Sequence, residues 1–160
     1  MVAIILIIAA IAIPNLLRAR ISANEASAVG SMRTIVTAEV SYNAAGWSSG
    51  ATPVGFSDTL AVLGVNGGGC ATGGAAASTS TCLIDDVLAK ATVSTSPKSG
   101  YFFTYTPNPA AGTFPHTGFS VNGDPATPGQ TGSRYFFTDQ SGVIRADPAT
   151  AATVSSNPIQ

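Results

Sequence analysis

The sequence predicts an α+β fold in which a long N-terminal helix, with a protruding apolar half, packs on a four-stranded antiparallel sheet. Two patterns lead to this prediction. Residues 1–13 form an uncharged apolar run that continues into a segment with helical periodicity. From Gly100 onward the period becomes strand-like, and the short connections between aromatic and β-branched runs favour antiparallel order.

The apolar run, MVAIILIIAAIAIP, is unstable in water, because burying one large aliphatic side chain is worth about 1.5–3 kcal/mol. It rises only about 20 Å, short of the roughly 20 residues of a bilayer crossing. We therefore expect it to need further apolar chain in lipid or apolar partners from other copies. The side chains expected to pack in such a core are Met1, Ile4, Ile5, Leu6, Ile7, Ile8, Ile11 and Ile13. A cleavable secretory signal is the weaker interpretation, since the basic residues follow the run rather than precede it.

The helix is expected to continue beyond Pro14 with a different face. Pro14 lacks an amide hydrogen, so we expect a break there, as a kink or as local melting. The face expected to lie on the core of the head consists of Leu17, Ile21, Ala28, Met32, Ile35 and Val36. Gly46 is a suitable C-terminal cap. A helix that runs from the N-terminus to just before Gly46 spans roughly 65 Å, so half of it must protrude from a domain this small.

The segment from residue 47 to 99 is rich in Gly, Ala, Ser and Thr and predicts loops with two short helices, over 59–63 and 83–89. It holds the only two cysteines, Cys70 and Cys82. In an exported protein a disulfide between them is the natural interpretation, although both could be free in a cytosolic protein.

Four runs of aromatic and β-branched residues predict the strands, at 101–105, 118–121, 134–138 and 143–146, with a turn at 139–142. The tail that follows is expected to be irregular. The predicted organisation is therefore a protruding helix (1–20) and a head (21–160), divided into an amphipathic helix (21–46), a variable loop region (47–99), the sheet (100–147) and the tail (148–160).

Composition and spacing argue against several classes of function. Only 9% of the residues are charged and the net charge is −1, which gives no electrostatic reason to expect a nucleic-acid partner. His116 is the only histidine and is expected in a solvated loop, without partners for a catalytic triad or a zinc site. We expect solvated charges at Asp85 and Asp86, and give a calcium site near Asp139 and Asp147 little weight. No enzyme activity, metal or cofactor is therefore predicted.

The two ends of the chain carry a resemblance. The string AIAIPNLLRARISANEASAVGSMRTI, residues 10–35, is similar to the N-terminal helix of bacterial type IV pilins and the related type II secretion pseudopilins. KSGYFFTYTP (98–107), TGSRYFFTDQSGVIRAD (131–147) and the closing Asn157–Ile159 resemble the globular end of one pilin subgroup. Residues 51–80 match little.

The resemblance implies the pilin fold and places this chain in a filament. Residues 1–13 would first lie in the inner membrane and then pack among neighbouring helices, residues 14–19 would be melted, and Cys70 and Cys82 would staple the head. Aligned on Pro14, the mature N-terminus of the family lies about two helical turns upstream of Met1. We therefore expect the leader, the N-methylated phenylalanine and the register-setting glutamate of the family to lie outside this sequence.

The leading hypothesis is a structural subunit of an extracellular type IV pilus, used for attachment or motility. Its expected partners are copies of itself, the inner membrane before assembly and the pilus assembly machinery. The alternatives are a type II secretion pseudopilin and, more remotely, a membrane-tethered adhesin or binding module. Exposed hydroxyls in the low-complexity loop make O-glycosylation compatible with the sequence, at Ser78, Thr79, Ser80 and Thr81.

Overall fold

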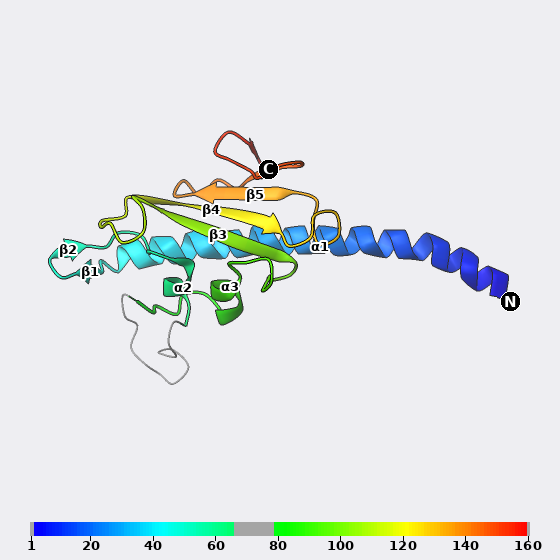
Figure 1. The fold of residues 1–160 in the computed structure, drawn as a ribbon, viewed down its shortest axis with the longest axis horizontal. Coiled ribbons are helices and arrows are strands. Elements are labelled where there is room, and N and C mark those ends of the chain that lie inside the picture. Colours follow the sequence, from blue (N-terminus) through cyan, green and yellow to red (C-terminus); the bar gives the residue numbers. More distant parts are fainter. Residues whose placement is uncertain (1, 66–78, 160) are drawn as a thin grey trace.

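The computed structural model describes residues 2–65 and 79–159, and for residues 4–12 it describes the backbone alone. One helix, α1 (Val2–Ala44), runs the length of the molecule and extends beyond the head at its N-terminal end (Figure 1). The C-terminus lies beside the sheet, far from the N-terminus (Figure 1). The α+β class and the long N-terminal helix are therefore confirmed.

The main sheet has five antiparallel strands in the described part of the chain, in the order β3-β4-β5-β6-β7. They are β3 (Tyr101–Asn108), β4 (Gly118–Pro125), β5 (Tyr135–Asp139), β6 (Arg145–Asp147) and β7 (Asn157–Pro158). The prediction of four strands is wrong by one, because β7 lies in the tail that was expected to be irregular. Two residues pair there, Arg145 with Pro158 and Ala146 with Asn157, and such a short strand has no pattern of its own.

The remaining elements lie at the distal end and along the side of the head. A small hairpin, β1 (Ser48–Ser49) and β2 (Thr52–Pro53), follows α1. The short helices α2 (Leu60–Leu63) and α3 (Asp86–Lys90) pack against each other beside α1 (Figure 1). The chain after α3 joins the edge strand β3, because the amide of Phe103 donates to the carbonyl of Ala91 at 2.7 Å. The side chain of Asp85 caps α3 by accepting from the amide of Leu88 at 2.6 Å.

The core forms where α1 packs on β3, β4 and β5. Met32 and Ile35 are fully buried there, together with aromatic side chains such as Phe103 and Phe136. Gly123 permits the close approach of α1, because a Cβ at this position would lie 3.4 Å from the sulfur of Met32. At its other end α1 stops near Gly46, which takes a left-handed φ of 66° as predicted for the cap.

The described backbone shows no local melting at Pro14, because α1 is continuous from Val2 to Ala44 with Pro14 inside it. A kink at Pro14 stays a prediction. Residues 14–19, expected to be melted in a filament, are helical here. Proline removes one amide donor, which leaves the carbonyl four positions earlier without its helical partner. Residues 13–20, which surround Pro14, are all exposed.

Candidate functional site

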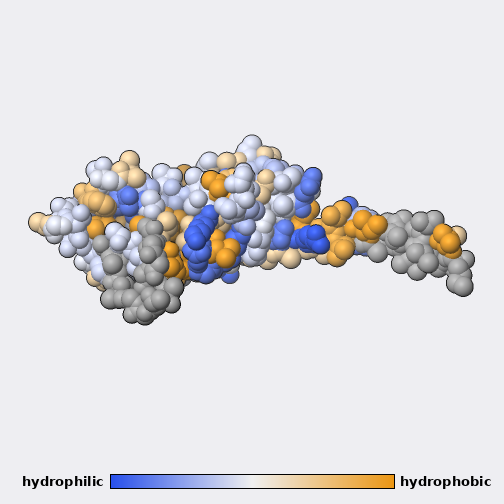
Figure 2. All heavy atoms as spheres, turned by 60° about the horizontal axis from the view of Figure 1, so that its bottom comes forward, coloured by the Kyte–Doolittle hydropathy of each residue, from blue (hydrophilic) through white to orange (hydrophobic). Residues whose placement is uncertain are grey.

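The protruding part of α1 presents apolar side chains that no part of the head covers. Ile13, Leu16 and Leu17 are 59%, 63% and 52% exposed. Figure 2 shows a hydrophobic band on the helix just outside the head, next to a hydrophilic collar where the helix leaves it. An apolar surface of this kind is typical of a site that binds other chains or lipid.

The predicted residues fall on both sides of the head boundary. Ala28, Met32 and Ile35 are buried, Val36 and Ile21 are partly buried, and Ile13 is exposed as expected for assembly. Leu17 was predicted to pack on the head and does not, because the head begins one turn later, at Ile21. Met1 and the side chains of Ile4, Ile5, Leu6, Ile7, Ile8 and Ile11 lie outside the described residues.

A polar anchor fixes α1 at the point where it enters the head. The Oε1 atom of Glu25 accepts from the amide and hydroxyl of Ser133 at 2.9 and 2.8 Å, and Oε2 accepts from Nε of Arg134 at 2.8 Å. One residue earlier, Nδ2 of Asn24 donates to the carbonyl of Thr131 at 2.8 Å. Helix and loop 131–134 are thereby joined by charge-assisted hydrogen bonds.

The electrostatics of this anchor favour an ionised carboxylate. Burial alone would raise the pKa of Glu25, but the hydrogen bonds from Ser133 and the guanidinium of Arg134 outweigh it, so the pKa is lowered. Glu25 is 5% exposed, whereas the Arg134 side chain is 46% exposed. The charge of Glu25 is thus satisfied inside the head, and the cation that satisfies it remains partly in water.

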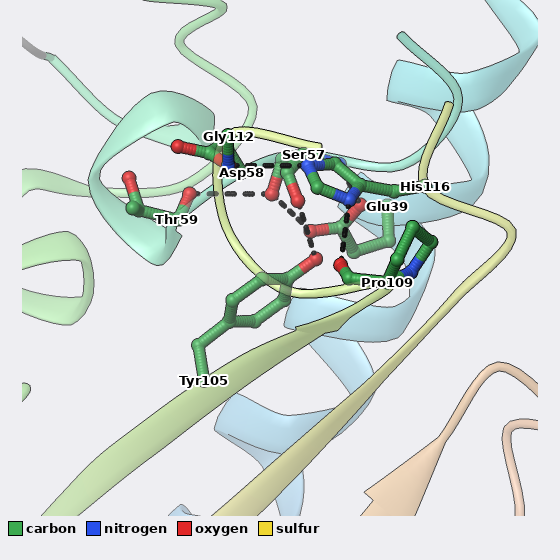
Figure 3. A network of polar contacts seen from close by, with 8 residues as sticks. All are labelled: Glu39, Ser57, Asp58, Thr59, Tyr105, Pro109, Gly112 and His116. Carbon is green, nitrogen blue, oxygen red and sulfur yellow. Dashed lines mark hydrogen bonds and ion pairs between the residues drawn. The ribbon is translucent and has the colours of Figure 1, made fainter. Parts of the chain in front are cut away.

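A second polar network lies inside the head, near its distal end (Figure 3). Glu39 is fully buried on α1; its Oε2 accepts from the amide of Ser57 at 3.0 Å, and its Oε1 accepts from the hydroxyl of Ser57. The hydroxyl of Tyr105 donates to the carbonyl of Ser57 at 2.9 Å. The network therefore ties α1 and β3 to the segment that precedes α2.

His116 belongs to this network and is buried, contrary to the prediction of a solvated loop histidine. Its Nδ1 lies 2.9 Å from the carbonyl oxygen of Pro109, and its Nε2 lies 3.1 Å from Oδ1 of Asp58 (Figure 3). Oδ1 of Asp58 also accepts from the amide of Gly112 at 2.7 Å. Both ring nitrogens therefore lie within hydrogen-bonding distance of an oxygen atom.

The network contains Ser, His and Asp, but its connectivity is not that of a nucleophilic triad. The Ser57 hydroxyl donates to Glu39, and among the described residues no hydrogen bond joins it to His116. A nucleophile must be activated by a neighbouring base and must be reachable by substrate. Ser57, Glu39 and His116 are each buried to 99% or more, so the arrangement suits a structural role.

Burial sets the ionisation of the acidic groups in this network. It raises the pKa of Glu39, and the hydrogen bonds from Ser57 and Tyr105 and the charge of His116 offset only part of that rise. Burial also raises the pKa of Tyr105, with the nearby Glu39 as the next cause, so the phenol stays a donor.

The other predicted residues have mixed outcomes. Cys82 is disulfide-bonded, and its predicted partner Cys70 lies outside the described residues, as does Ser78. Thr79 is exposed and remains a candidate for O-glycosylation. Ser80 and Thr81 are buried, which contradicts the expectation of exposed hydroxyls. The reason is backbone pairing with the end of α2, since Thr81 donates its amide to Val62 at 3.0 Å.

The acidic pairs singled out from the sequence are engaged locally. Asp85 and Asp86 pair with Lys98 and Lys90 at 2.6 and 2.7 Å, and their side chains are 54% and 47% exposed. Asp139 and Asp147 accept hydrogen bonds from the backbone amides of the turns that follow them. Across the described residues, no three His, Cys, Asp or Glu side chains gather in a way that could hold a metal ion.

Sequence reasoning missed both networks, although one signal was present. Glu25 and Glu39 lie on the same helical stripe as Ala28, Met32 and Ile35, because the five residues follow one another at intervals of three or four positions. An acidic residue on an apolar stripe must be buried with partners or left unsatisfied. Its partners, at 57 and 133–134, are distant in sequence and have no local pattern.

Comparison of the chain with protein-family models, with curated proteins and with solved structures finds no match. Within the described residues, no helix combines the length and apolarity needed to cross a membrane. The function is therefore argued from the geometry of the chain and from its sequence.

Proposed function

We propose that this chain is a structural subunit that polymerises through its N-terminal helix into a type IV pilus-like extracellular filament. The observation that carries the proposal is the uncovered apolar surface of the protruding helix at Ile13, Leu16 and Leu17. The head has its own closed core and does not need that surface to fold. The proposed partners are copies of the chain, the inner membrane before assembly, and assembly machinery that moves subunits between them.

The energetics of burial support association over an isolated subunit. Each of the three exposed aliphatic side chains would gain about 1.5–3 kcal/mol on complete burial. Association must also offset the loss of translational and rotational freedom. Contacts between unlike surfaces of identical subunits form a closed ring only if the rotation between subunits completes a circle. Otherwise they extend as an open helix.

The buried networks support a coat-forming head rather than a catalytic one. The Glu25 anchor holds the helix rigidly at the base of the head, and the Glu39 network holds it near the distal end. A subunit fixed at two points along α1 places its head in a constant orientation relative to the protruding helix. That is the mechanical requirement for a regular filament, and it needs no reactive group.

The test uses charged substitutions on the protruding helix. In cells expressing the chain, Leu16→Asp/Leu17→Asp is expected to abolish filaments in sheared surface material, because each subunit would bury two unpaired carboxylates. Val154→Asp is the matched control, since Val154 is 62% exposed on the head. Electron microscopy should show filaments for wild type and Val154→Asp. Filaments of normal abundance from the double variant would refute the proposal.

The same experiment separates the proposal from the alternatives. Micrometre-long fibres containing the chain support the pilus subunit. Their absence, together with failed export of other proteins on deletion, would indicate a pseudopilin. If the head alone kept full affinity for a surface ligand and the chain never polymerised, an adhesin would be the better assignment.

A further inference from the structure

Six of the seven lysine and arginine side chains of this chain fall into two groups. Lys90, Lys98 and Arg134 each pair with an acid on the head, at 2.6–2.8 Å. Arg18, Arg20 and Arg33 are exposed on α1, and no acidic side chain of the described residues pairs with them. Arg145, on β6, pairs with no acid in the described part of the chain, but its Nη1 donates to the carbonyl of Ser156 at 3.0 Å. The cations with neither an acid nor a hydrogen-bonded carbonyl among the described residues are therefore on the helix.

Two of these cations lie where the apolar surface ends. Arg18 and Arg20 directly follow Leu16 and Leu17 and precede the first head contact at Ile21. At 3.6 residues per turn they point to opposite flanks of the helix, so together they form a basic collar around it. The nearest acid along the chain, Glu25, is already satisfied by Ser133 and Arg134. Figure 2 shows hydrophilic surface next to the hydrophobic band, at the point where the helix leaves the head.

We propose that Arg18 and Arg20 bind anionic phospholipid headgroups, so that the unassembled subunit is retained on membranes of negative surface charge. This inference rests on the proposed function, because it concerns the subunit before assembly. A helix that enters the acyl region through its apolar residues places the next turn at headgroup level. Arginine there keeps its stem on the apolar boundary and its guanidinium among the phosphates.

The attraction between the arginines and the membrane is electrostatic, and the contributions of Arg18 and Arg20 add. A basic residue near an anionic surface strengthens binding roughly fivefold, and the attraction falls off within about 10 Å at 0.1 M salt. Arg33 lies about 20 Å further along the helix, beyond that range, and provides the matched control. Because the guanidinium groups occupy both flanks, rotation of the helix about its axis does not remove both from the surface.

The test measures binding of the full chain to vesicles of phosphatidylcholine alone and of phosphatidylcholine with one third phosphatidylglycerol. The chain is kept in mild detergent, diluted below the micelle concentration, and sedimented with sucrose-loaded vesicles. Wild type is expected to prefer the anionic vesicles, and 1 M salt should remove this preference. Arg18→Gln/Arg20→Gln should lose the preference while keeping its affinity for neutral vesicles, and Arg33→Gln should behave as wild type.

Equal binding of wild type to the two vesicle compositions would overturn the inference. So would a loss of preference in Arg33→Gln as large as in the double variant, since net charge alone would then explain it. Circular dichroism of each variant checks that the fold is kept. Filaments are scored separately: assembly without lipid preference rejects only this inference, whereas lipid preference without filaments rejects only the proposed function.

Discussion

Glu25 and Glu39 lie on the same stripe of α1 as the apolar core, yet burial has opposite consequences for their two carboxyl groups. Glu25 gains a guanidinium and three further donors, which lower its pKa. Glu39 gains hydrogen bonds from Ser57 but lies in a fully buried site, and its pKa is raised. The balance between desolvation and partners decides each case.

Replacing Glu39 should therefore have a pH-dependent effect. The folded protein binds the Glu39 proton more tightly than the unfolded chain, so stability falls as pH rises above the ordinary value of 4.5. Glu39→Gln keeps an acceptor for the Ser57 amide and removes this dependence. Denaturant unfolding from pH 4 to pH 8 should show the variant gaining stability relative to wild type as pH rises. A constant difference would contradict the raised pKa.

Glu39→Ala is the companion variant, because it removes the acceptor of the Ser57 amide and leaves the Ser57 hydroxyl only the carbonyl of Thr59, at 3.2 Å. We expect it to lower the free energy of unfolding by about 2–4 kcal/mol. An effect below about 0.5 kcal/mol would show that the network does not hold α1 to the segment before α2.

A backbone contact in the same region gives a prediction at one glycine. Gly55 has a φ of 78°, and a Cβ there would overlap the carbonyl of His116. Gly55→Ala should cost more than about 3 kcal/mol, since His116 pairs through its backbone with Val54 and Phe56 and cannot retreat. Gly50→Ala is the control: its φ is 64° and its surroundings are open, so only the left-handed strain of about 1–2 kcal/mol should appear. Equal thermal shifts would contradict the close approach.

At the scale of elements, a helix or strand could be predicted from the sequence where its pattern is local. The end of α1 at Gly46, the helix over 60–63 and strands β3, β4 and β5 follow from periodicity and turn residues a few positions apart. β7 does not, because its two residues pair with β6 only once the tail has crossed the sheet. The burial of His116 was equally hidden, since its partner Asp58 is 58 positions away.

The attachment of α1 to loop 131–134 should be lost in acid and on truncation of Glu25. The lowered pKa means that the anchor stabilises the fold above pH 4.5 and weakens as pH falls below that value. Glu25→Ala should lower the free energy of unfolding at pH 7 by about 2–4 kcal/mol, because the buried amide donors lose their acceptor. Ser27→Ala removes an exposed hydrogen bond to Ser99 and should change stability by less than about 0.5 kcal/mol. Similar chemical-denaturation midpoints for the two variants would contradict the anchor.

At the scale of the whole molecule, the two ends of the chain have different roles. Ile13, Leu16 and Leu17 of the protruding helix stay outside the head. The absence of charged residues from positions 1–13 was enough to predict that this end of the chain is apolar. The tail closes the outer face of the sheet: Asn122 donates to the carbonyl of Ala152 at 2.8 Å, and the amide of Ile159 donates to Ile144 at 2.9 Å. Nothing local marks the tail as structural.

Truncations at the two ends of the chain should therefore behave differently. Removing residues 1–20 should leave the thermal midpoint of the head unchanged and yield a monomer, because α1 makes its first contact with the head at Ile21. Removing residues 148–160 should lower the free energy of unfolding by about 2–4 kcal/mol, through loss of β7 and of the buried Ala152. Differential scanning fluorimetry and analytical ultracentrifugation of both chains provide the measurement. If the first truncation unfolded the head, or if it self-associated as the full chain does, the protruding helix would not be the assembly surface.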